Sequence, residues 1–586
     1  MTVKPFGMAR ICDETSLRAL QHRDTSFPMQ AVPSRLYLTF VEFRLTAKRN
    51  PLMSRLWHQN AVIYQIDPTR FYDSNADGWG DLRGIVEKLD YVESLGATAI
   101  WLTPFYLSPR RDNGYDVENH TEPDPRIGSL DDVEWLIAEA DKRGIRVIIE
   151  LVAQHTSDAH DWFQEARKGR DNPFHDYYLW RDTPGPDEPA PMFPTIEPHI
   201  WRWDEQAQRY YRHLFYHHEP DLNLRHPDVI QAVDHVLRFW AEKGVAGFRV
   251  DAASHMVEQA SLPGDKESGY RLFNHFYDLL TDDHPDMILL GEVDVNVSEF
   301  EDFFGGGERL TTLLNFWINK NTILALAREE AAPLVKALNE LPMPPANGGY
   351  CFWLRNHDEL DLEDLEPEDY DFVMEKYAPD PDMRIYGRGI RRRLAPMLDG
   401  NERQQAMAHA LLFSLPGTPV VRYGAEIGMG DLLSQPERES VRTPMQWNAG
   451  PGAGFSACDP ARFVEPLITD GPFRYQAINV EEQEARDGSL LHRIRQIIAV
   501  WRTLPEICYQ HFHPFTVQEK SVFAVRYQNH NVATLMLTNL SHEAVTVDLG
   551  ELNLEGAGEI LADDEYPPVA CSLRINGYGY RWLRVK

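Results

Sequence analysis

From residue 61 onward the chain repeats a short apolar run followed by a longer amphipathic stretch, and the repeat occurs eight times. Runs that are nearly continuously hydrophobic are typical of parallel strands covered on both faces. Eight of them separated by helical patterns predict an α/β fold, a (β/α)8 TIM barrel. The alternative is an open doubly wound sheet, but it gives no reason for eight units, and the chain has no glycine-rich phosphate turn. The expected strands are 61–66, 97–102, 146–151, 246–251, 287–292, 312–316, 350–355 and 418–423.

The segment between the third and fourth strands is far longer than an ordinary strand-to-helix loop, which predicts an inserted domain there. A second long and densely charged excursion, 361–397, follows the seventh strand. Both are candidate lids over the barrel, and both are also compatible with solvated loops. After about residue 505 short alternating strands predict a C-terminal β-sandwich. The expected boundaries are 54–155 and 223–504 for the barrel, 156–222 for the inserted domain and 505–586 for the sandwich.

Residues 1–53 differ from the rest, because they carry more basic than acidic residues and no helical or alternating period. We expect a disordered extension, and a transit or regulatory arm is the alternative. Translation from Met1 and from Met53 are both compatible with the sequence.

Charge and composition limit the partners of the chain. The 58 basic and 90 acidic residues give a net charge of −32, which opposes binding to nucleic acid or to anionic membranes. No run approaches the ~20 apolar residues of a membrane helix. The five cysteines are scattered, without the spacing of a metal knuckle or a redox pair, which indicates reduced thiols and a cytoplasmic location. We therefore expect a small-molecule partner, and a homo-oligomer is compatible with the sequence.

Three acidic residues stand where predicted strands end. Asp251, Glu292 and Asp358 follow the fourth, fifth and seventh strands. In a barrel the functional side chains lie at the C-terminal ends of the strands. A carboxylate that closes an apolar strand is costly unless it faces a polar opening. Three converging carboxylates suit cleavage of a glycosidic bond, with one nucleophile and one proton donor. The alternative is that each acid pairs with a structural arginine.

The neighbours of these acids suggest a division of roles. Arg249 lies two residues before Asp251, on the same side of the strand, and its charge would hold Asp251 ionised as a nucleophile. Glu292 has no adjacent cation in the sequence, so crowding by the other carboxylates should raise its pKa and keep its proton for the leaving oxygen. Asp358 would bind sugar hydroxyls and stabilise the cationic transition state.

Six short motifs carry a resemblance to a known family. They are Gly-Phe-Arg-Val-Asp (247–251), Gly-Glu-Val (291–293), Arg-Asn-His-Asp (355–358), Asp-Asn-Gly-Tyr-Asp (112–116), Glu-Pro-Asp-Leu-Asn (219–223) and Arg-Thr-Pro-Met-Gln-Trp (442–447). From about residue 57 onward the chain resembles the α-amylase superfamily of retaining glycoside hydrolases. The resemblance implies a nucleophile at Asp251, an acid/base at Glu292 and a stabiliser at Asp358. It also implies that the sugar is held by Asp112, Tyr115, His155, Arg249, His357 and Arg442.

Within the superfamily the chain looks most like trehalose synthases, which isomerise maltose to trehalose. The similar stretches include Asn-His-Asp-Glu-Leu (356–360) and Gly-Tyr-Gly-Tyr-Arg-Trp-Leu (577–583). The resemblance implies an α-linked disaccharide or small oligosaccharide as substrate. The alternatives are a hydrolase of short α-glucosides and, more remotely, a non-catalytic sugar-binding subunit.

Some positions depart from the superfamily pattern. Glu150 and Gln154 stand where Asp and Asn are usual, and Ala425 stands where Asp is usual. His255, in the segment after Asp251, could line the subsite next to the cleaved one. These changes bear on the choice of substrate and leave the three acids untouched.

The segment 73–81 places oxygen ligands at alternating positions with a glycine after the third. That spacing suits Ca²⁺, and a solvated acidic turn is the alternative. It resembles the superfamily's structural calcium site, which takes Mg²⁺ in some members. A second calcium is not expected, because Gln154 replaces its usual asparagine ligand, and no organic cofactor is expected. The implied ligands are Asp73, Asn75, Asp77, the Trp79 carbonyl and Asp81.

Overall fold

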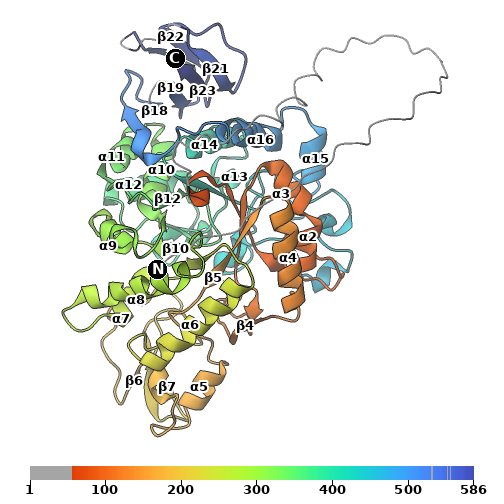
Figure 1. Cartoon of the computed structure of the whole chain (residues 1–586). Coiled ribbons are helices and arrows are strands. Elements are labelled where there is room, and N and C mark those ends of the chain that lie inside the picture. The colour runs from red at the N-terminus through yellow and green to blue at the C-terminus, as the bar shows by residue number, and fades with distance from the viewer. Residues whose placement is uncertain (1–55, 530–531, 551, 553, 555, 586) are drawn as a thin grey trace, which may run out of the picture. The chain divides into compact units, whose positions relative to one another are not determined.

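Eight parallel strands close into a barrel in the computed structural model, which describes residues 56–529, 532–550, 552, 554 and 556–585 (Figure 1). The order around the barrel is β1-β16-β12-β11-β10-β9-β5-β2, so each of the eight predicted strands is present and the predicted fold is confirmed. The prediction for residues 1–53 lies outside the described residues. The strands are β1 (Ile63–Ile66), β2 (Ala99–Leu102), β5 (Arg146–Leu151), β9 (Gly247–Val250), β10 (Ile288–Val293), β11 (Thr312–Asn315), β12 (Gly349–Phe352) and β16 (Thr418–Arg422).

Helices cover the outside of the barrel, and most of them bury one apolar face, whereas α10 (Phe316–Arg328) and α14 (Glu402–Leu412) are buried along most of their residues. Helix α4 (Leu130–Lys142) begins at a capping box, in which Ser129 and Asp132 satisfy each other's backbone N–H groups. Two helices, α2 (Leu82–Glu87) and α3 (Leu89–Leu95), follow each other directly, because Lys88 leaves the helical conformation (φ −104°, ψ 4°) between them. The other longer helices are α6 (Pro227–Glu242), α7 (Ala253–Ala260), α8 (Lys266–Thr281), α11 (Ala332–Glu340) and α16 (Leu490–Trp501).

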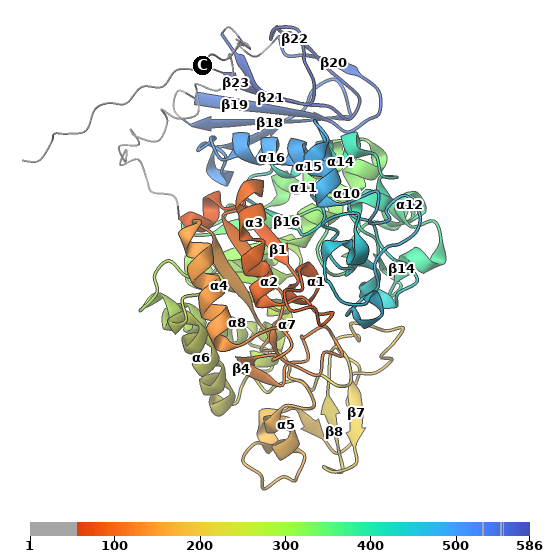
Figure 2. The same cartoon turned by 90° about the vertical axis from the view of Figure 1, so that its right-hand side faces the viewer.

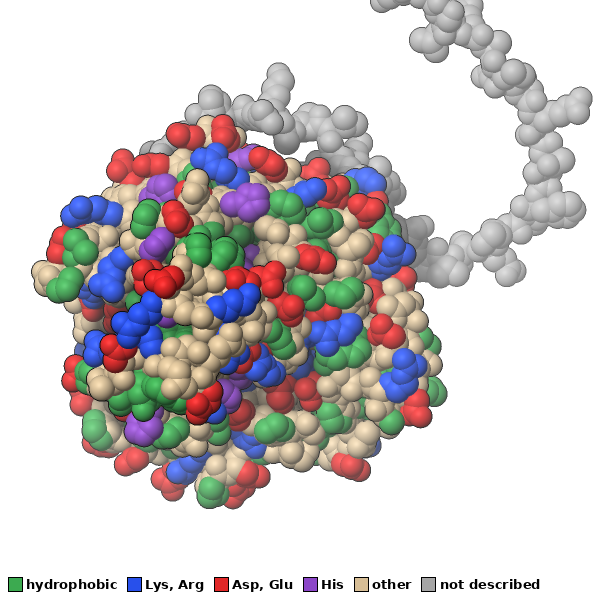
Figure 3. Space-filling view, turned by 90° about the horizontal axis from the view of Figure 1, so that it is seen from below, with side chains coloured by type: hydrophobic (Ala, Val, Ile, Leu, Met, Phe, Trp, Pro, Cys, Tyr) green, Lys and Arg blue, Asp and Glu red, His purple; other side chains and the backbone are tan. Residues whose placement is uncertain are grey.

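The long segment after β5 forms a small layer of its own. Its strands β6 (Trp180–Arg181), β7 (Trp201–Asp204) and β8 (Arg209–Arg212) form an antiparallel sheet in the order β6-β8-β7, beside the short helix α5 (Asp161–Ala166). In Figure 1 this layer lies below the barrel. Side chains seen from that side mix acidic and basic groups without a continuous basic patch (Figure 3).

The excursion after β12 also has structure. It contains helix α12 (Pro367–Tyr377) and a three-stranded antiparallel sheet in the order β13-β15-β14. Short helix α13 (Leu394–Met397) returns the chain to the barrel helices. The three strands are β13 (Leu360–Asp361), β14 (Arg384–Ile385) and β15 (Gly389–Ile390).

The C-terminal region contains two antiparallel sheets, in agreement with the predicted sandwich. The sheet β17-β18-β19-β23-β21 and the pair β20-β22 enclose an apolar cluster that includes Leu535, Val547 and Leu573. This region packs on helices α14 and α16, at the opposite end of the barrel from the inserted layer (Figure 2). The sequence indicated four of its strands. The strands are β17 (Phe512–Phe515), β18 (Val522–Asn529), β19 (Val532–Asn539), β20 (Val545–Asp548), β21 (Gly558–Ala562), β22 (Ser572–Ile575) and β23 (Tyr580–Val585).

Among the described residues, no helix combines the length and apolar character that a bilayer crossing requires.

Candidate active site

One cavity of about 460 Å³ opens at the C-terminal ends of the barrel strands. Asp251, Glu292 and Asp358 all line it, although 107 residues separate the first from the last in the chain. The parallel barrel brings them together because β9 pairs with β10, and β10 reaches β12 through β11. Of the other expected sugar-binding residues, Asp112, Tyr115, His155 and His255 line the same cavity.

Arg249 connects the first two acids. Its Nη1 donates to Asp251 Oδ1 at 2.5 Å, and its Nη2 forms an ion pair with Glu292 Oε1. The guanidinium is 1% exposed, so the contacts lie away from solvent. No basic residue is adjacent to Glu292 in the sequence. In the fold, Glu292 and Asp251 both contact the guanidinium of Arg249. Sharing a single guanidinium holds the two carboxyl groups near each other.

Ala252 adds a second connection. Its backbone N–H donates to Glu292 Oε2 at 2.8 Å. Ala252 adopts the left-handed conformation, with φ 46° and ψ 41°, directly after Asp251. A residue with a Cβ pays roughly 1 kcal/mol or more for that conformation, and such conformations cluster at functional sites. The turn that ends β9 therefore points the backbone N–H of Ala252 toward Glu292 on β10.

The two connected acids have raised pKa values. Burial raises the pKa of Glu292 to about 7, and the negative charges of Asp251 and Asp358 add to the rise while Arg249 opposes it. Burial also raises the pKa of Asp251 above its ordinary value, against the opposing charge of Arg249. For Glu292 the direction agrees with the sequence prediction, but burial contributes more than the crowding of carboxylates on which that prediction relied.

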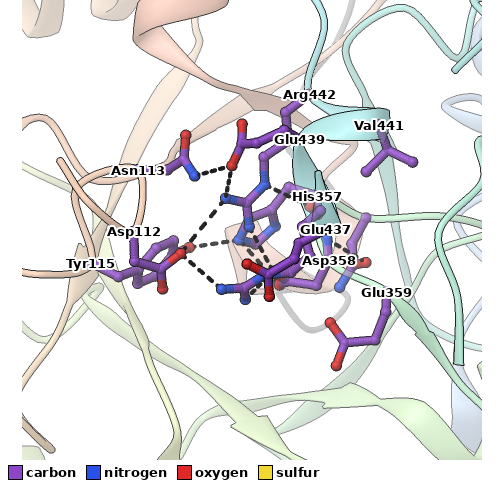
Figure 4. Close-up of polar contacts among 12 residues, drawn as sticks. Asp112, Asn113, Tyr115, His357, Asp358, Glu359, Glu437, Glu439, Val441 and Arg442 are labelled. Atoms are coloured by element: carbon purple, nitrogen blue, oxygen red, sulfur yellow. Dashed lines mark hydrogen bonds and ion pairs between the residues drawn. The ribbon is translucent and has the colours of Figure 1, made fainter. Parts of the chain in front are cut away.

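Asp358 lies in a strongly cationic environment. Burial alone would raise its pKa, but the neighbouring His357, Arg438 and Arg442 hold the pKa well below its usual range. Arg442 Nη2 donates to Asp358 Oδ1 at 2.9 Å and Arg438 Nη1 to the same oxygen at 3.0 Å. Figure 4 shows Asp358, Arg442 and Asp112 grouped around these contacts. Asp358 is therefore ionised at neutral pH.

Arg438 is not among the site residues that the sequence predicts. It lines the cavity and its Nη2 donates to Asp112 Oδ1 at 2.7 Å, so it joins Asp112 to Asp358. In the sequence it sits in the run Glu-Arg-Glu (437–439), which has the look of an exposed charged turn. Only its position four residues before Arg442, in the same short segment, pointed to the site.

Tyr115 lines the cavity and contacts the buried His357. Their rings stack with centroids 5.7 Å apart, and Tyr115 Oη lies 2.6 Å from His357 Nε2. Tyr115 Oη also donates to Glu150 Oε1 at 3.0 Å, and Arg249 Nη1 donates to Glu150 Oε2 at 2.9 Å. Burial raises the pKa of Glu150 to about 8. Glu150, which departs from the superfamily pattern and is longer than the usual aspartate, thus connects Tyr115 and Arg249 through hydrogen bonds.

Both the oxygen and the nitrogen of the Gln154 side-chain amide form hydrogen bonds within the protein. Its Oε1 accepts from His155 Nδ1 at 2.7 Å, and its Nε2 donates to Asp221 Oδ1 at 3.0 Å. His255 lies at the cavity edge, with Nδ1 3.2 Å from Glu258 Oε2.

The inserted layer and the excursion after β12 meet over the cavity. Arg388 Nη1 donates to the Met192 carbonyl at 2.7 Å, and the rings of Phe193 and Tyr386 lie 4.6 Å apart. Both segments line the cavity, so they form its roof. Tyr386 Oη donates to Glu437 Oε1 at 2.8 Å, which joins the roof to the segment that carries Arg438.

The loop 73–81 lies outside this cavity. Asp73 and Asp81 are each 4% exposed, and their oxygens accept backbone N–H groups of the loop, such as Gly78 N–H to Asp73 at 2.8 Å. Burial raises the pKa of Asp81, and the nearby Asp73 carboxylate adds to that rise. In the described part of the chain no group of three or more acidic, His or Cys side chains converges as a preformed metal cluster. By their chemistry the oxygen donors of the loop fit a hard cation, which would relieve the repulsion between Asp73 and Asp81.

Comparison with known proteins identifies the family. Residues 65–358 and 391–509 match the family described as alpha amylase, catalytic domain. The chain belongs to the alpha-amylase family. These segments contain the three acids, Arg249 and Arg442, whereas the cavity-lining residues of the excursion after β12, from Glu359 to Arg388, lie between the two matched segments. The chain is an alpha-amylase-family glycosidase or glycosyltransferase.

Related sequences cover most of the chain. The trehalose synthase/amylase TreS of Mycobacterium tuberculosis is 36% identical over 543 residues, which are 90% of each chain. The trehalose-6-phosphate hydrolase of Escherichia coli is 29% identical over 90% of this chain and 98% of its own. Among solved structures, a mutant isomaltulose synthase from Erwinia rhapontici with bound sucrose has a TM-score of 0.73 and 25% identity, covering 92% of this chain and 100% of that one.

Proposed function

We propose that this enzyme isomerises maltose to trehalose through a covalent glucosyl intermediate on Asp251. The observation that carries the proposal is the roof over the acids, which the Arg388–Met192 hydrogen bond and the Phe193–Tyr386 ring contact hold together. The similarity to the mycobacterial trehalose synthase/amylase supports the same reaction.

In the first step Asp251 attacks the anomeric carbon and Glu292 gives its proton to the glycosidic oxygen, so that the bond to the second glucose breaks. The raised pKa of Glu292, about 7, suits a proton donor at neutral pH. Asp358, held ionised by Arg438 and Arg442, stabilises the positive charge that develops on the sugar ring. Retention requires carboxyl groups only about 5 Å apart, and the shared contact with Arg249 favours a short separation.

In the second step the freed glucose turns within the cavity. Its anomeric hydroxyl attacks the glucosyl carbon, Glu292 accepts the hydroxyl proton, and Asp251 leaves as a carboxylate. The product contains an α,α-1,1 bond. Hydrolysis follows the same route with water as the attacking group, so the outcome depends on how well the cavity excludes water while holding glucose. A cavity of about 460 Å³ lies within the roughly 300–1,000 Å³ of small-ligand sites.

The charge of the cavity favours a neutral sugar. Nine acidic and three basic side chains line it, the basic ones being Lys320, Arg388 and Arg438. Arg388 and Lys320 are already paired with acids, for example in the Lys320–Asp294 ion pair at 3.1 Å. A phosphorylated disaccharide would meet net negative charge there, so we infer a substrate unlike that named for the Escherichia coli relative.

The test is to incubate the protein with maltose and separate the products by chromatography. Trehalose in excess over glucose supports the isomerase, and glucose alone supports the second candidate, an α-glucosidase. No conversion of maltose or of other short α-glucosides would contradict both. Trehalose 6-phosphate serves as the charged control and should be turned over poorly.

We also propose that loop 73–81 holds a structural Ca²⁺, or Mg²⁺ in its place, through Asp73, Asn75, Asp77, the Trp79 carbonyl and Asp81. The support is the buried pair of acids in an oxygen-rich loop. Such an ion would stiffen the connection that follows α1 (Pro68–Phe71) and would take no part in the reaction.

A cytoplasmic location remains our proposal. Its support is that the four cysteines in the described residues, Cys351, Cys458, Cys508 and Cys571, are free thiols.

A further inference from the structure

Three side chains line the catalytic cavity without a part in the steps proposed above: Asp294, Phe316 and Lys320. For the transferred glucose the sequence predicts several contacts, such as Asp112. For the second glucose, which has to leave, turn and attack, the sequence points only to His255 at the cavity edge. The three additional side chains are therefore candidates for holding the second glucose.

Asp294 directly follows strand β10 and lies two residues after Glu292. Alternate residues of an extended chain point to the same side and lie roughly 7 Å apart. In the proposed reaction Glu292 protonates the oxygen between the two glucose units, so a side chain one step further along the same edge of the barrel faces the unit that leaves. The Asp294 side chain is 33% exposed and lines the cavity, so a ligand can reach it.

Lys320 anchors Asp294. Its Nζ donates to Asp294 Oδ1 at 3.1 Å and also to Asp364. The lysine side chain is 1% exposed and sits in helix α10 beside buried apolar residues such as Ile323. A buried lysine costs free energy unless carboxylates pair with it. Burial raises the pKa of Asp294 to about 6, and the charge of Lys320 opposes this rise, so Asp294 is ionised at neutral pH.

The Asp294 carboxylate keeps acceptor capacity for a ligand. Lys320 is the one hydrogen-bond partner that the described residues give to it, through Oδ1. An ionised carboxylate offers about four acceptor positions on its two oxygens, so Oδ2 remains available to groups in the cavity. Sugar hydroxyls are donors, and hydrogen bonds to an ionised acceptor are stronger than those between neutral groups. Asp294 can therefore fix the second glucose by its hydroxyl groups.

Phe316 adds an apolar surface beside this acid. It lies four residues before Lys320 and hence on the same face of helix α10. Its ring is half-buried, and it packs edge-on against Trp353, with centroids 4.9 Å apart. That contact fixes the ring where it lines the cavity, and an aromatic ring suits the C–H face of a sugar. A carboxylate and a ring together match the polar and apolar sides of one glucose unit.

We propose that Asp294, positioned by Lys320 and assisted by Phe316, binds the second glucose unit of maltose and retains it after the glycosidic bond breaks. The inference rests on the proposed function, because only a reaction that reuses the cleaved glucose requires its retention. The competing explanation is that the Lys320–Asp294 pair only connects β10 and the excursion after β12, through Asp364. A purely structural pair affects the stability of the fold and leaves the affinity for maltose unchanged.

The first test is titration calorimetry with maltose on protein made inactive by Asp251→Asn. Adding Asp294→Ala should raise the Kd for maltose by about tenfold or more, because a hydrogen bond to a charged group is lost. Lys320→Met should raise the Kd less, since Asp294 keeps its oxygens but loses its anchor. Asp278→Ala, the same change at an exposed position of α8, should leave the Kd unchanged. Melting curves of all variants separate binding from stability.

The second test measures retention directly in the active enzyme. Unlabelled maltose is converted in the presence of ¹³C-labelled glucose, and the labelled fraction of the trehalose is determined by mass spectrometry. Asp294→Ala should raise this fraction several-fold, because cleaved glucose escapes and external glucose takes its place. The Asp278→Ala control should match the unaltered protein.

The outcomes separate this inference from the proposed function. An unchanged Kd for maltose in the Asp294→Ala protein, with or without a lower melting temperature, would overturn the role of Asp294. An Asp294-dependent Kd in a protein that forms glucose but no trehalose would support the contact with the second glucose and overturn the isomerisation.

Discussion

The backbone N–H of Ala252 donates to Glu292 Oε2 at 2.8 Å, so the residue after Asp251 orients the side chain of Glu292. Arg249 reinforces the arrangement by contacting both Asp251 and Glu292. The nucleophile and the proton donor proposed here are therefore held as one unit, and changes to either should affect the chemistry more than the fold.

Asp251→Asn should lower turnover of maltose by more than about 1,000-fold, because the amide cannot form the glucosyl ester. The fold should persist, since an amide of the same shape still faces Arg249. Steady-state rates with melting curves of both proteins provide the check. Residual activity above about one part in a thousand would argue against Asp251 as nucleophile.

The rate should fall as pH rises through about 7. Burial raises the pKa of Glu292 to about that value, and the donor is active only in its protonated form, which is lost above its pKa. The profile of kcat/KM against pH measures this alkaline limb.

Kinetics with an α-glucosyl fluoride as substrate show whether Glu292 or another titrating group causes the alkaline limb. Fluoride leaves without protonation, so Glu292→Gln should form the glucosyl enzyme from the fluoride at a rate that shows no limb near pH 7. If the limb persists in Glu292→Gln, another group, such as Glu150 with its pKa of about 8, is responsible.

Arg388→Ala should shift the products from trehalose toward glucose by several-fold. The change removes the hydrogen bond to the Met192 carbonyl that joins the two halves of the roof, and a looser roof admits water. The ratio of glucose to trehalose formed from maltose is the measurement. Arg384→Ala, in the same excursion but outside the catalytic cavity, is the matched control. An unchanged ratio in Arg388→Ala would mean that the roof does not control water.

Chelation should lower the melting temperature by several degrees if loop 73–81 holds a cation, because a bound ion stabilises only the folded chain. Restoring Ca²⁺ should reverse the loss, and elemental analysis should find about one ion per chain. In Asp77→Ala the effect of EDTA should be small. A melting curve that EDTA leaves unmoved in the unaltered protein would remove the assignment.

The sequence by itself determined the barrel and the three acids, because both depend on local patterns. Apolar runs such as Arg146–Leu151 are recognisable as parallel strands, and a carboxylate that closes such a run must face the open end of the barrel. Asp251 and Glu292 could therefore be assigned to one pocket before any coordinates were known.

Only the tertiary structure decided the contacts that cross between distant segments. The Arg388–Met192 hydrogen bond and the contacts of Arg438 with both Asp112 and Asp358 could not be predicted from the sequence. A guanidinium reaches several ångströms from its backbone, and whether it meets a carboxylate, a carbonyl or an empty space depends on the packing of chain segments far away in sequence.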